Sequence, residues 1–200
     1  MSHKDDWVVI GISGVTCGGK TSLSNMLKNK IVPVYLFHQD KYFYPDDSLH
    51  HVKCADMEHN NYDILSSLDM EQMYKDICCT IEGKDMSHDN NLVNGDFKIH
   101  GKKFLVIEGF TVLNFEPIIK LCDFSYYFVL DYGECARRRC LRVYDPPDIP
   151  GYFEACVWPE HLKYRAQVEK DNRIKMLDGT RPDALETVLQ DLATVEAQKT

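Results

Sequence analysis

The chain has 200 residues, of which 44% are hydrophobic and 27% charged, a composition typical of a globular domain and not of a disordered protein. Its formal charge of −8 argues against nucleic acid or an anionic membrane as a partner. No apolar run approaches the roughly 20 residues that cross a bilayer, and the first residues lack the apolar core of a secretory signal. We therefore expect one domain over residues 1–200 in the cytoplasm, with the nucleus reached by diffusion, and reduced thiols at all eight cysteines.

Short apolar runs alternate with amphipathic stretches along the chain. The apolar runs predict strands at 7–12, 32–37, 104–107, 124–130 and 174–177. The amphipathic stretches predict helices at 21–30, 63–82, 117–121, 132–143, 160–170 and 184–197. Asp63 is expected to cap the second helix. This alternation predicts an α/β fold with a doubly wound, mostly parallel sheet of five strands and helices on both faces.

The segments between these elements are polar or rich in proline. Residues 83–102 predict a surface loop or hairpin. The proline-rich segment 144–159 predicts an irregular flap, so that residues from about 132 to 160 form a small lid able to close over a substrate. Residues 38–61 predict a polar loop. Its irregular spacing of metal-ligand types favours an ordinary loop over a zinc site at His50, His51, Cys54 and His59.

The segment Gly14–Thr21 matches the phosphate-binding pattern G-x4-G-K-[ST] between a predicted strand and a predicted helix. Its backbone N–H groups and the helix N-terminus would bind phosphate oxygens. Lys20 would reach the β- and γ-phosphates, and the Thr21 hydroxyl would ligate Mg²⁺. The expected ATP-binding residues here are Gly14, Val15, Thr16, Cys17, Gly18, Gly19, Lys20, Thr21 and Ser22. The pattern alone leaves open whether the nucleotide is hydrolysed to drive a motion or gives its phosphoryl group to a small molecule.

Three groups of residues favour transfer to a small molecule. Asp40 ends the second predicted strand, where it could accept the proton of an attacking hydroxyl and lie near Mg²⁺. Glu108 follows an apolar strand in the manner of a Walker B acid and would hold Mg²⁺ directly or through water. The third group is Arg137, Arg138 and Arg139 with Arg142 on a predicted helix. Arg142 would share a helix face with Arg138 and Arg139, where like charges repel, so that the cluster indicates an anionic ligand.

Each of these groups also has a plain structural interpretation. Asp40 could cap a turn, Glu108 could be an exposed acid after a strand, and the arginines could form a solvated basic face. A guanine-specific GTPase would need an N-K-x-D-like motif after a late strand, where this chain has D-G-T-R-P at 178–182. Arg181 in that loop could cover the face of an adenine.

The motifs of the chain resemble those of the nicotinamide riboside kinases, relatives of the uridine and other nucleoside kinases. The resemblance runs from Ile10 to about Leu189. It rests on G-I-S-G-V-T at 11–16, G-K-T at 19–21, H-Q-D at 38–40, Y-D at 62–63, I-E-G-F at 107–110, E-C-x-R-R-R-x-x-R-V-Y at 134–144, P-P-D-x-P-G-Y-F at 146–153, V-W-P at 157–159, L-K-Y-R at 162–165 and L-D-G-T at 177–180. The phosphate-binding loop is shared by many families, whereas the run from 142 to 159 is far more specific.

The resemblance implies phosphorylation of the 5′-hydroxyl of nicotinamide riboside by ATP with Mg²⁺, which gives nicotinamide mononucleotide for NAD synthesis. It implies that nicotinic acid riboside is accepted too. The implied catalytic residues are Asp40, as the base, with Lys20, Arg138 and Arg142. The implied metal residues are Thr21, Asp40 and Glu108. The implied residues for the phosphates and adenine of ATP, besides the loop, are Arg138, Arg142, Arg181 and Asp183.

The resemblance also implies how the riboside is held. Tyr62 and Tyr144 would lie on either side of the pyridine ring, and Asp63 and Arg139 would bind the ribose hydroxyls. The full implied set for the riboside is Asp40, Tyr42, Phe43, Tyr62, Asp63, Arg139, Tyr144 and Asp145. The pyridine ring of the riboside is cationic, so two tyrosine faces would attract it by roughly 1–2 kcal/mol beyond area burial, and neutral uracil would gain less.

The chain departs from the family pattern at a few positions. Lys41 stands where the family has a second aspartate, and Tyr42 stands where it has phenylalanine. The segment 154–156 is E-A-C in place of D-G-H. Lys41 could hold phosphate or lower the pKa of Asp40 if it points inward, or be a solvated lysine if it points outward.

We expect a nucleoside and ATP as the only partners, with neither nucleic acid nor a membrane, in a monomer or weak homodimer. Two other functions stay open. One is a uridine or cytidine kinase with the same loop, base and lid. The other is a catalytically weak nucleotide-binding scaffold, for which Lys41 and the altered flap are the hints.

Overall fold

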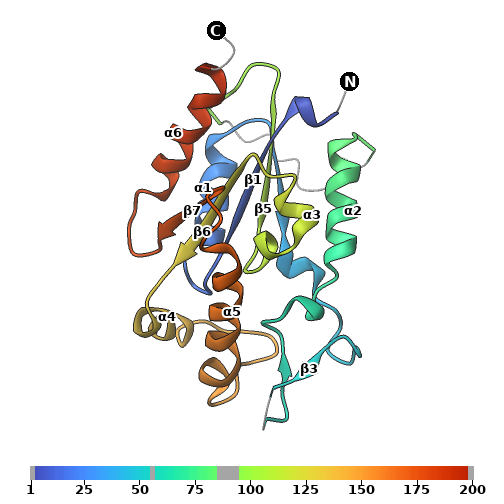
Figure 1. The fold of residues 1–200 in the computed structure, drawn as a ribbon, viewed down its shortest axis with the longest axis vertical. Helices are drawn as coiled ribbons and strands as arrows, with labels where there is room; N and C mark the ends of the chain where they lie inside the picture. The colour runs from blue at the N-terminus through green and yellow to red at the C-terminus, as the bar shows by residue number, and fades with distance from the viewer. Residues whose placement is uncertain (1–2, 55–56, 85–94, 198–200) are drawn as a thin grey trace.

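A computed structural model describes residues 3–54, 57–84 and 95–197, and its centre is a parallel β-sheet (Figure 1). The strand order is β2-β5-β1-β6-β7, and every neighbouring pair in this sheet is parallel. The strands are β1 Trp7–Gly14, β2 Val34–His38, β5 Lys103–Glu108, β6 Phe124–Val129 and β7 Ile174–Asp178. The predicted fold class, an α/β protein with a five-stranded parallel sheet, is therefore confirmed.

Helices cover both faces of the sheet because its strands are apolar on both sides (Figure 1). Along β1, Val9 packs into one core cluster while Val8 and Ile10 pack into the other, as the alternation of side chains in a strand requires. One cluster includes side chains of α1 Lys20–Lys30 and α6 Ala184–Ala197. The other includes side chains of α2 Met70–Ile81, α3 Glu116–Ile119 and α5 Trp158–Val168.

The first strand occupies the centre of the sheet, between β5 and β6. The chain therefore runs outward from β1 in both directions, and the carboxyl ends of neighbouring strands meet at one edge. His38 of β2 is in register with Glu108 of β5, and Ile12 of β1 is in register with the same Glu108. Ligands of open α/β sheets bind at this kind of reversal point, outside the carboxyl ends of the strands.

Two predicted helices have wrong boundaries. The predicted cap Asp63 does not start a helix, since α2 begins at Met70 and its cap is Asp69, whose side chain accepts a hydrogen bond from the backbone N–H of Gln72. The residues before it form a short 3₁₀ turn, Leu65–Ser67. Helix α4 covers Tyr132–Arg139 and stops there, so the prediction that Arg142 shares a helix face with Arg138 is wrong.

Regular structure also appears where the sequence predicts only loops. Two short strands, β3 Val52–Lys53 and β4 Asn60–Asn61, form an antiparallel hairpin inside the predicted loop 38–61. A π-helix, Phe153–Val157, leads directly into α5 and replaces the end of the predicted irregular flap. The predicted loop 83–102 falls partly outside the described residues, and its described end pairs Phe97 with Ile31.

The prediction of eight reduced cysteines is wrong for one pair. Cys54, beside the hairpin, and Cys156, in the π-helix, form a disulfide although 102 residues separate them in sequence. Both belong to a buried cluster with Tyr152 and Val157. Packing of the hairpin against the flap brings the two thiols together, which the spacing of cysteines in the sequence does not reveal.

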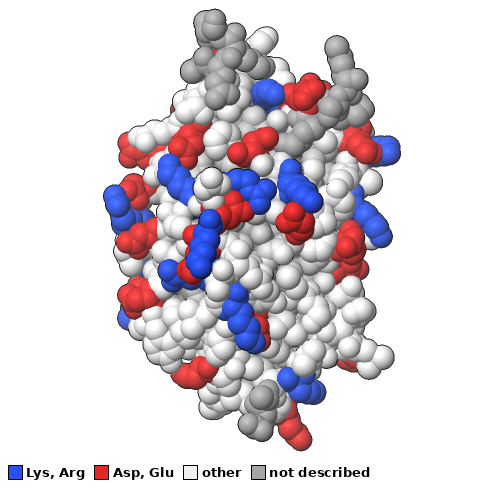
Figure 2. Space-filling view, in the orientation of Figure 1, with Lys and Arg blue, Asp and Glu red and all other residues white. Residues whose placement is uncertain are grey.

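Surface charge is mixed in sign. Figure 2 shows acidic and basic side chains interspersed over one face of the molecule. Exposed ion pairs of the described chain include Lys175 with Asp191, 2.9 Å apart. Within the described ranges, none of the helices combines the length and the apolar character that crossing a membrane requires.

Candidate active site

The phosphate-binding loop connects β1 to α1 and depends on glycines at two positions. Gly14 has a φ of 120°, and a Cβ there would lie 2.3 Å from the carbonyl oxygen of Phe128. Gly19, with a φ of 111°, immediately precedes the first residue of α1. Cys17 adopts a positive φ of 58° without being glycine. These conformations curl the chain around the N-terminus of α1, the geometry in which backbone N–H groups converge on an anion.

The side chain of Lys20 binds to the backbone of this loop. Its Nζ donates hydrogen bonds to the carbonyl oxygens of Gly14, at 3.0 Å, and Val15, at 2.7 Å. Loss of hydration lowers the pKa of Lys20, while the nearby carboxylates of Glu108 and Asp40 raise it. The ammonium group therefore lies between the phosphate-binding loop and two acids, where it could contact a transferring phosphoryl group.

Glu108, at the end of β5, is only 4% exposed. It accepts a hydrogen bond of 3.4 Å from the Thr21 hydroxyl and lies 2.7 Å from Nδ1 of His38. A hydroxyl and a carboxylate at the mouth of a phosphate-binding loop are hard oxygen ligands that suit Mg²⁺. No group of three or more His, Cys, Asp or Glu side chains in the described part of the chain could hold a metal alone. Thr21 and Glu108 fit a Mg²⁺ ion, which binds proteins through one or two carboxylates together with substrate phosphates and water.

Asp40 lies in a 3₁₀ turn, Gln39–Tyr42, directly after β2. The turn is fixed by Gln39, a fully buried residue whose amide donates to the Thr111 hydroxyl at 2.8 Å and accepts from the Thr111 N–H at 3.1 Å. Loss of hydration and the neighbouring Glu108 raise the pKa of Asp40, and Lys20, His38 and Arg142 oppose this shift. Asp40 thus has the environment of a carboxylate able to accept a proton.

These groups open into one cavity of about 340 Å³. The cavity brings together most of the side chains that the sequence predicts for catalysis and riboside binding. Predicted residues that line it are Thr16, Cys17, Lys20, Thr21, Asp40, Phe43, Tyr62, Asp63, Glu108, Arg139, Arg142, Tyr144 and Asp145. They come from the carboxyl edge of the sheet, the hairpin region and the flap, so the cavity lies between the sheet and its two covering segments.

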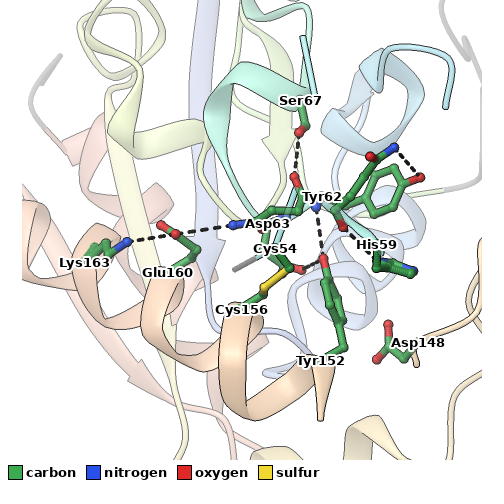
Figure 3. Close-up of a disulfide and its surroundings, with 12 residues drawn as sticks. Cys54, His59, Tyr62, Asp63, Ser67, Asp148, Tyr152, Cys156, Glu160 and Lys163 are labelled. Carbon is green, nitrogen blue, oxygen red and sulfur yellow. Dashed lines mark hydrogen bonds and ion pairs between the residues drawn. A yellow bond between two sulfur atoms is a disulfide. The ribbon is translucent and has the colours of Figure 1, made fainter. Parts of the chain in front are cut away.

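Arg139 organises the side of the cavity that faces the flap. Its guanidinium makes two hydrogen bonds to Asp148, at 2.7 and 3.0 Å, and lies 3.8 Å from Asp63. Tyr152 donates a 3.0 Å hydrogen bond to Asp63, and the same hydroxyl accepts one from the Tyr62 N–H (Figure 3). Sequence reasoning assigned no role to Asp148 or Tyr152, although both stand in the P-P-D-x-P-G-Y-F motif. Asp148 lies in an irregular loop 9 residues after Arg139, and Tyr152 is 89 residues from Asp63, so no local pattern predicts either contact.

Two tyrosines come from opposite segments. The Tyr62 hydroxyl donates a 3.0 Å hydrogen bond to Asp46, and the Tyr144 hydroxyl lies 3.3 Å from the Thr16 hydroxyl of the phosphate-binding loop. Arg139 stacks on Tyr144, with its guanidinium carbon 4.3 Å from the ring centre. Further aromatic side chains line the same cavity, namely Phe43, Tyr44, Phe110 and Tyr152.

Some predicted residues lie outside the cavity. Tyr42 directs its hydroxyl to Asp76, 3.0 Å away on α2, and packs against the core. Lys41 is exposed and does not line the cavity. Ser22 is exposed in the first turn of α1. Arg181 forms an exposed ion pair of 2.6 Å with Asp183.

Arg138 connects three segments of the chain through hydrogen bonds. Its guanidinium donates to the carbonyl oxygens of Cys17, at 3.1 Å, and Gly179, at 3.0 Å, while Nε pairs with Glu134. It therefore ties α4 to the phosphate-binding loop and to the loop after β7. Arg142, beyond the end of α4, is the arginine that reaches the cavity together with Arg139.

A phosphate-binding loop lies at the reversal point of a parallel sheet, with an acid on the adjoining strand and a second carboxylate in the same cavity. This arrangement defines a P-loop kinase. Comparison with known proteins narrows this class. Nicotinamide riboside kinase 1 of Rattus norvegicus is 37% identical over 179 residues, 88% of this chain and 87% of the relative. Nicotinamide riboside kinase 1 of Homo sapiens is 36% identical over 193 residues, 92% and 94% of the two chains. The chain belongs to the nicotinamide riboside kinase family.

Two further similarities are more distant. Uridine kinase of Saccharomyces cerevisiae is 26% identical over 199 residues, which are 93% of this chain and 38% of that protein. The solved structure of a possible uridine kinase from Bacillus stearothermophilus shares 16% identity at a TM-score of 0.47, over 84% of this chain and 87% of that one. No protein-family model matches the chain.

Proposed function

We propose that this protein transfers the γ-phosphoryl group of ATP to the 5′-hydroxyl of nicotinamide riboside, and also of nicotinic acid riboside, to give the mononucleotide for NAD synthesis. The observation that carries the proposal is the cavity itself. It joins a phosphate-binding loop, at Thr16 to Thr21, to a wall of tyrosines and carboxylates at Tyr62 and Tyr144. Similarity at 35–37% identity to nicotinamide riboside kinases over most of the chain supports the same substrate.

In the proposed reaction Asp40 takes the proton of the 5′-hydroxyl as its oxygen attacks the γ-phosphorus. Lys20 and Arg142 stabilise the negative charge on the phosphoryl group, because both line the cavity close to Asp40. Thr21 and Glu108 would hold a Mg²⁺ ion, which would neutralise charge on the phosphate oxygens. Catalysis then comes mainly from positioning and electrostatics.

The riboside itself would be held by charged and aromatic groups. Asp63 and Arg139 bind the ribose hydroxyls, and Asp148 and Tyr152 fix those two side chains through the hydrogen bonds described above. Tyr62 and Tyr144 lie on either side of the base. A cationic pyridine ring gains more from tyrosine faces than neutral uracil does, which favours a pyridine riboside over uridine.

The lid proposed for residues of about 132–160 combines α4 with the flap and stays part of one catalytic domain. The adenine of ATP is proposed to lie near the loop after β7, where Arg181 and Asp183 are found. Arg138 would order this region through its bonds to Cys17 and Gly179.

A substrate panel tests the proposal. ADP release with ATP and Mg²⁺ would be compared for nicotinamide riboside, nicotinic acid riboside, uridine and cytidine, with Lys20→Ala as the blank. We expect strong preference for the pyridine ribosides. Preference for uridine or cytidine would keep the mechanism and overturn the substrate, and ATP binding without turnover of any nucleoside would favour a nucleotide-binding scaffold.

A further inference from the structure

The side chains that line the cavity include more carboxylates than cations. Three cations, Lys20, Arg139 and Arg142, share it with six carboxylates. The charge of Arg139 is balanced by Asp148, to which its guanidinium donates two hydrogen bonds. Lys20 and Arg142 both act on Asp40 across the phosphoryl end of the cavity. The remaining carboxylates include Asp46 and Asp145, the two at the wall formed by the tyrosines.

Asp46 and Asp145 lie close to the ring-binding wall. Oδ1 of Asp46 accepts the hydrogen bond from the Tyr62 hydroxyl, and Asp145 directly follows Tyr144 in the chain. Both carboxylates line the cavity together with Tyr62. Loss of hydration raises the pKa of Tyr62, and the charges of Asp46 and Asp145 raise it further. Among the residues that the structure describes, neither carboxylate forms an ion pair with a lysine or arginine within 4.0 Å.

We infer that Asp46 and Asp145 make this kinase selective for the amide over the acid form of its substrate. The inference rests on the proposed function, in which the pyridine ring lies between Tyr62 and Tyr144. Nicotinamide riboside and nicotinic acid riboside have nearly the same shape and the same cationic ring. They differ by one carboxylate, which like charges at this wall would repel, so electrostatics is the main feature by which the cavity distinguishes them.

The expected selectivity is moderate because both aspartates are exposed. Exposed charge pairs interact weakly, so we expect the two aspartates together to change kcat/KM by about fivefold to tenfold. The same exposure makes the effect sensitive to ionic strength, since charges separated by about 10 Å are screened at roughly 0.1 M salt.

The test compares kcat/KM for the two pyridine ribosides in the natural protein and in the double variant Asp46→Asn/Asp145→Asn. Asparagine at 46 keeps an oxygen that can accept the Tyr62 hydrogen bond and removes only the charge. We expect the natural protein to favour nicotinamide riboside by about fivefold to tenfold, and the variant to reduce that ratio about fivefold. Asp47→Asn, an exposed acid next to Asp46 that does not line the cavity, is the matched control and should leave the ratio unchanged.

A second measurement needs no variant. In the natural protein, raising the salt concentration should reduce the same ratio, while a ratio set by shape would stay constant. A ratio that neither the charge changes nor salt alters, with both ribosides phosphorylated, overturns the selectivity and leaves the proposed function intact. Turnover of uridine with neither pyridine riboside overturns the proposed function, and the selectivity with it.

Discussion

The position of Asp40 depends on the neighbouring residue Gln39, which does not line the cavity. Gln39 is fully buried, and its two hydrogen bonds to Thr111 fix the turn that carries Asp40. Gly109 is packed so closely that a Cβ there would lie 2.3 Å from the Gln39 side chain. The position of this proposed base is therefore set by a buried amide and a glycine from the segment after β5.

Replacement of Asp40 by asparagine should lower kcat at least about a hundredfold, the usual effect of losing a general base, with little change in KM for ATP. Steady-state ADP release checks this, with Asp47→Asn as the control on the same loop.

Because loss of hydration and Glu108 raise the pKa of Asp40, activity of the natural protein should fall on acidification at a higher pH than an ordinary aspartate gives. Turnover of Asp40→Asn within tenfold of normal would remove Asp40 from the role of base.

Tyr144 has two separable parts, a ring that lines the cavity and a hydroxyl near Thr16 and Cys17 of the phosphate-binding loop. Loss of the ring in Tyr144→Ala should raise KM for nicotinamide riboside about tenfold, by removing roughly 1–2 kcal/mol of stacking, and raise KM for ATP much less. Tyr144→Phe keeps the ring and serves as the control. Equal increases of both KM values in Tyr144→Ala would show that the residue supports the loop and does not bind the base.

At the scale of elements, the cavity is covered by two segments that are distant in sequence. The hairpin region before Asp63 and the flap around Tyr152 meet through the buried cluster at the disulfide (Figure 3). The Tyr152 hydroxyl bonds both the Tyr62 backbone and Asp63. Each segment therefore positions residues of the other, and they are expected to act as a single cover.

Cys156→Ser should lower the free energy of unfolding by about 2–5 kcal/mol, because the Cys54–Cys156 link closes a loop of 102 residues. Urea denaturation with and without a dithiol reductant measures this. Cys54→Ser and the double variant should each cost about as much as Cys156→Ser, since any one of them removes the whole link. If reductant leaves the midpoint of the natural protein unchanged, the disulfide does not stabilise the fold in solution.

The sequence predicts elements well where local signals dominate. Helix α6 covers the predicted 184–197, and the phosphate-binding loop lies as expected between β1 and α1. The prediction from the sequence fails where tertiary contacts decide between local signals of similar strength. Asp63 looks like a helix cap, but Arg139 and Tyr152 hold its carboxylate in the cavity, and Asp69 caps α2 instead. The hairpin and the π-helix stabilise each other through tertiary contacts, so neither segment has a sequence pattern that predicts its structure.

At the scale of the molecule, His161 connects the stability of the core to pH. It is 8% exposed on α5, stacks on Tyr127 of β6 with ring centres 6.2 Å apart, and loss of hydration, then Lys20 and Arg165, lower its pKa to about 4. The unfolded chain binds a proton at His161 near pH 6.5, but the folded protein resists protonation until about pH 4. The stability that depends on neutral His161 is therefore present above pH 6.5 and lost as the pH falls toward 4.

His161→Phe keeps the aromatic stack and removes the titration. The loss of unfolding free energy between about pH 7.5 and 5 should be smaller in this variant than in the natural protein by about 2 kcal/mol. Urea denaturation at the two pH values measures it, with the exposed His100→Ala as control. Identical pH dependence in His161→Phe and the natural protein would show that another group controls acid unfolding.

The arrangement of layers follows from the sequence because apolar strands buried on both faces and alternating helices leave few other topologies. The strand order places the carboxyl ends of β1, β2 and β5 side by side, so Lys20, Asp40 and Glu108 meet as expected. The sequence could not show which segments cover them. Asp148 enters the cavity beside Arg139, and Asp46 enters it beside Tyr62, through loops whose course the sequence pattern does not show.

The central position of β1 also has a consequence for how the protein is made. Trp7 pairs with Lys103, and Ile10 pairs with Phe124, so the strand that leads to the phosphate-binding loop leaves the ribosome long before its partners. At roughly 5–20 residues per second, translation takes about 5–20 s to reach β5. During that interval a strand that is wholly buried in the finished sheet is exposed on the nascent chain. We expect this kinase to need a chaperone during synthesis more than proteins of similar size whose first strand lies at a sheet edge.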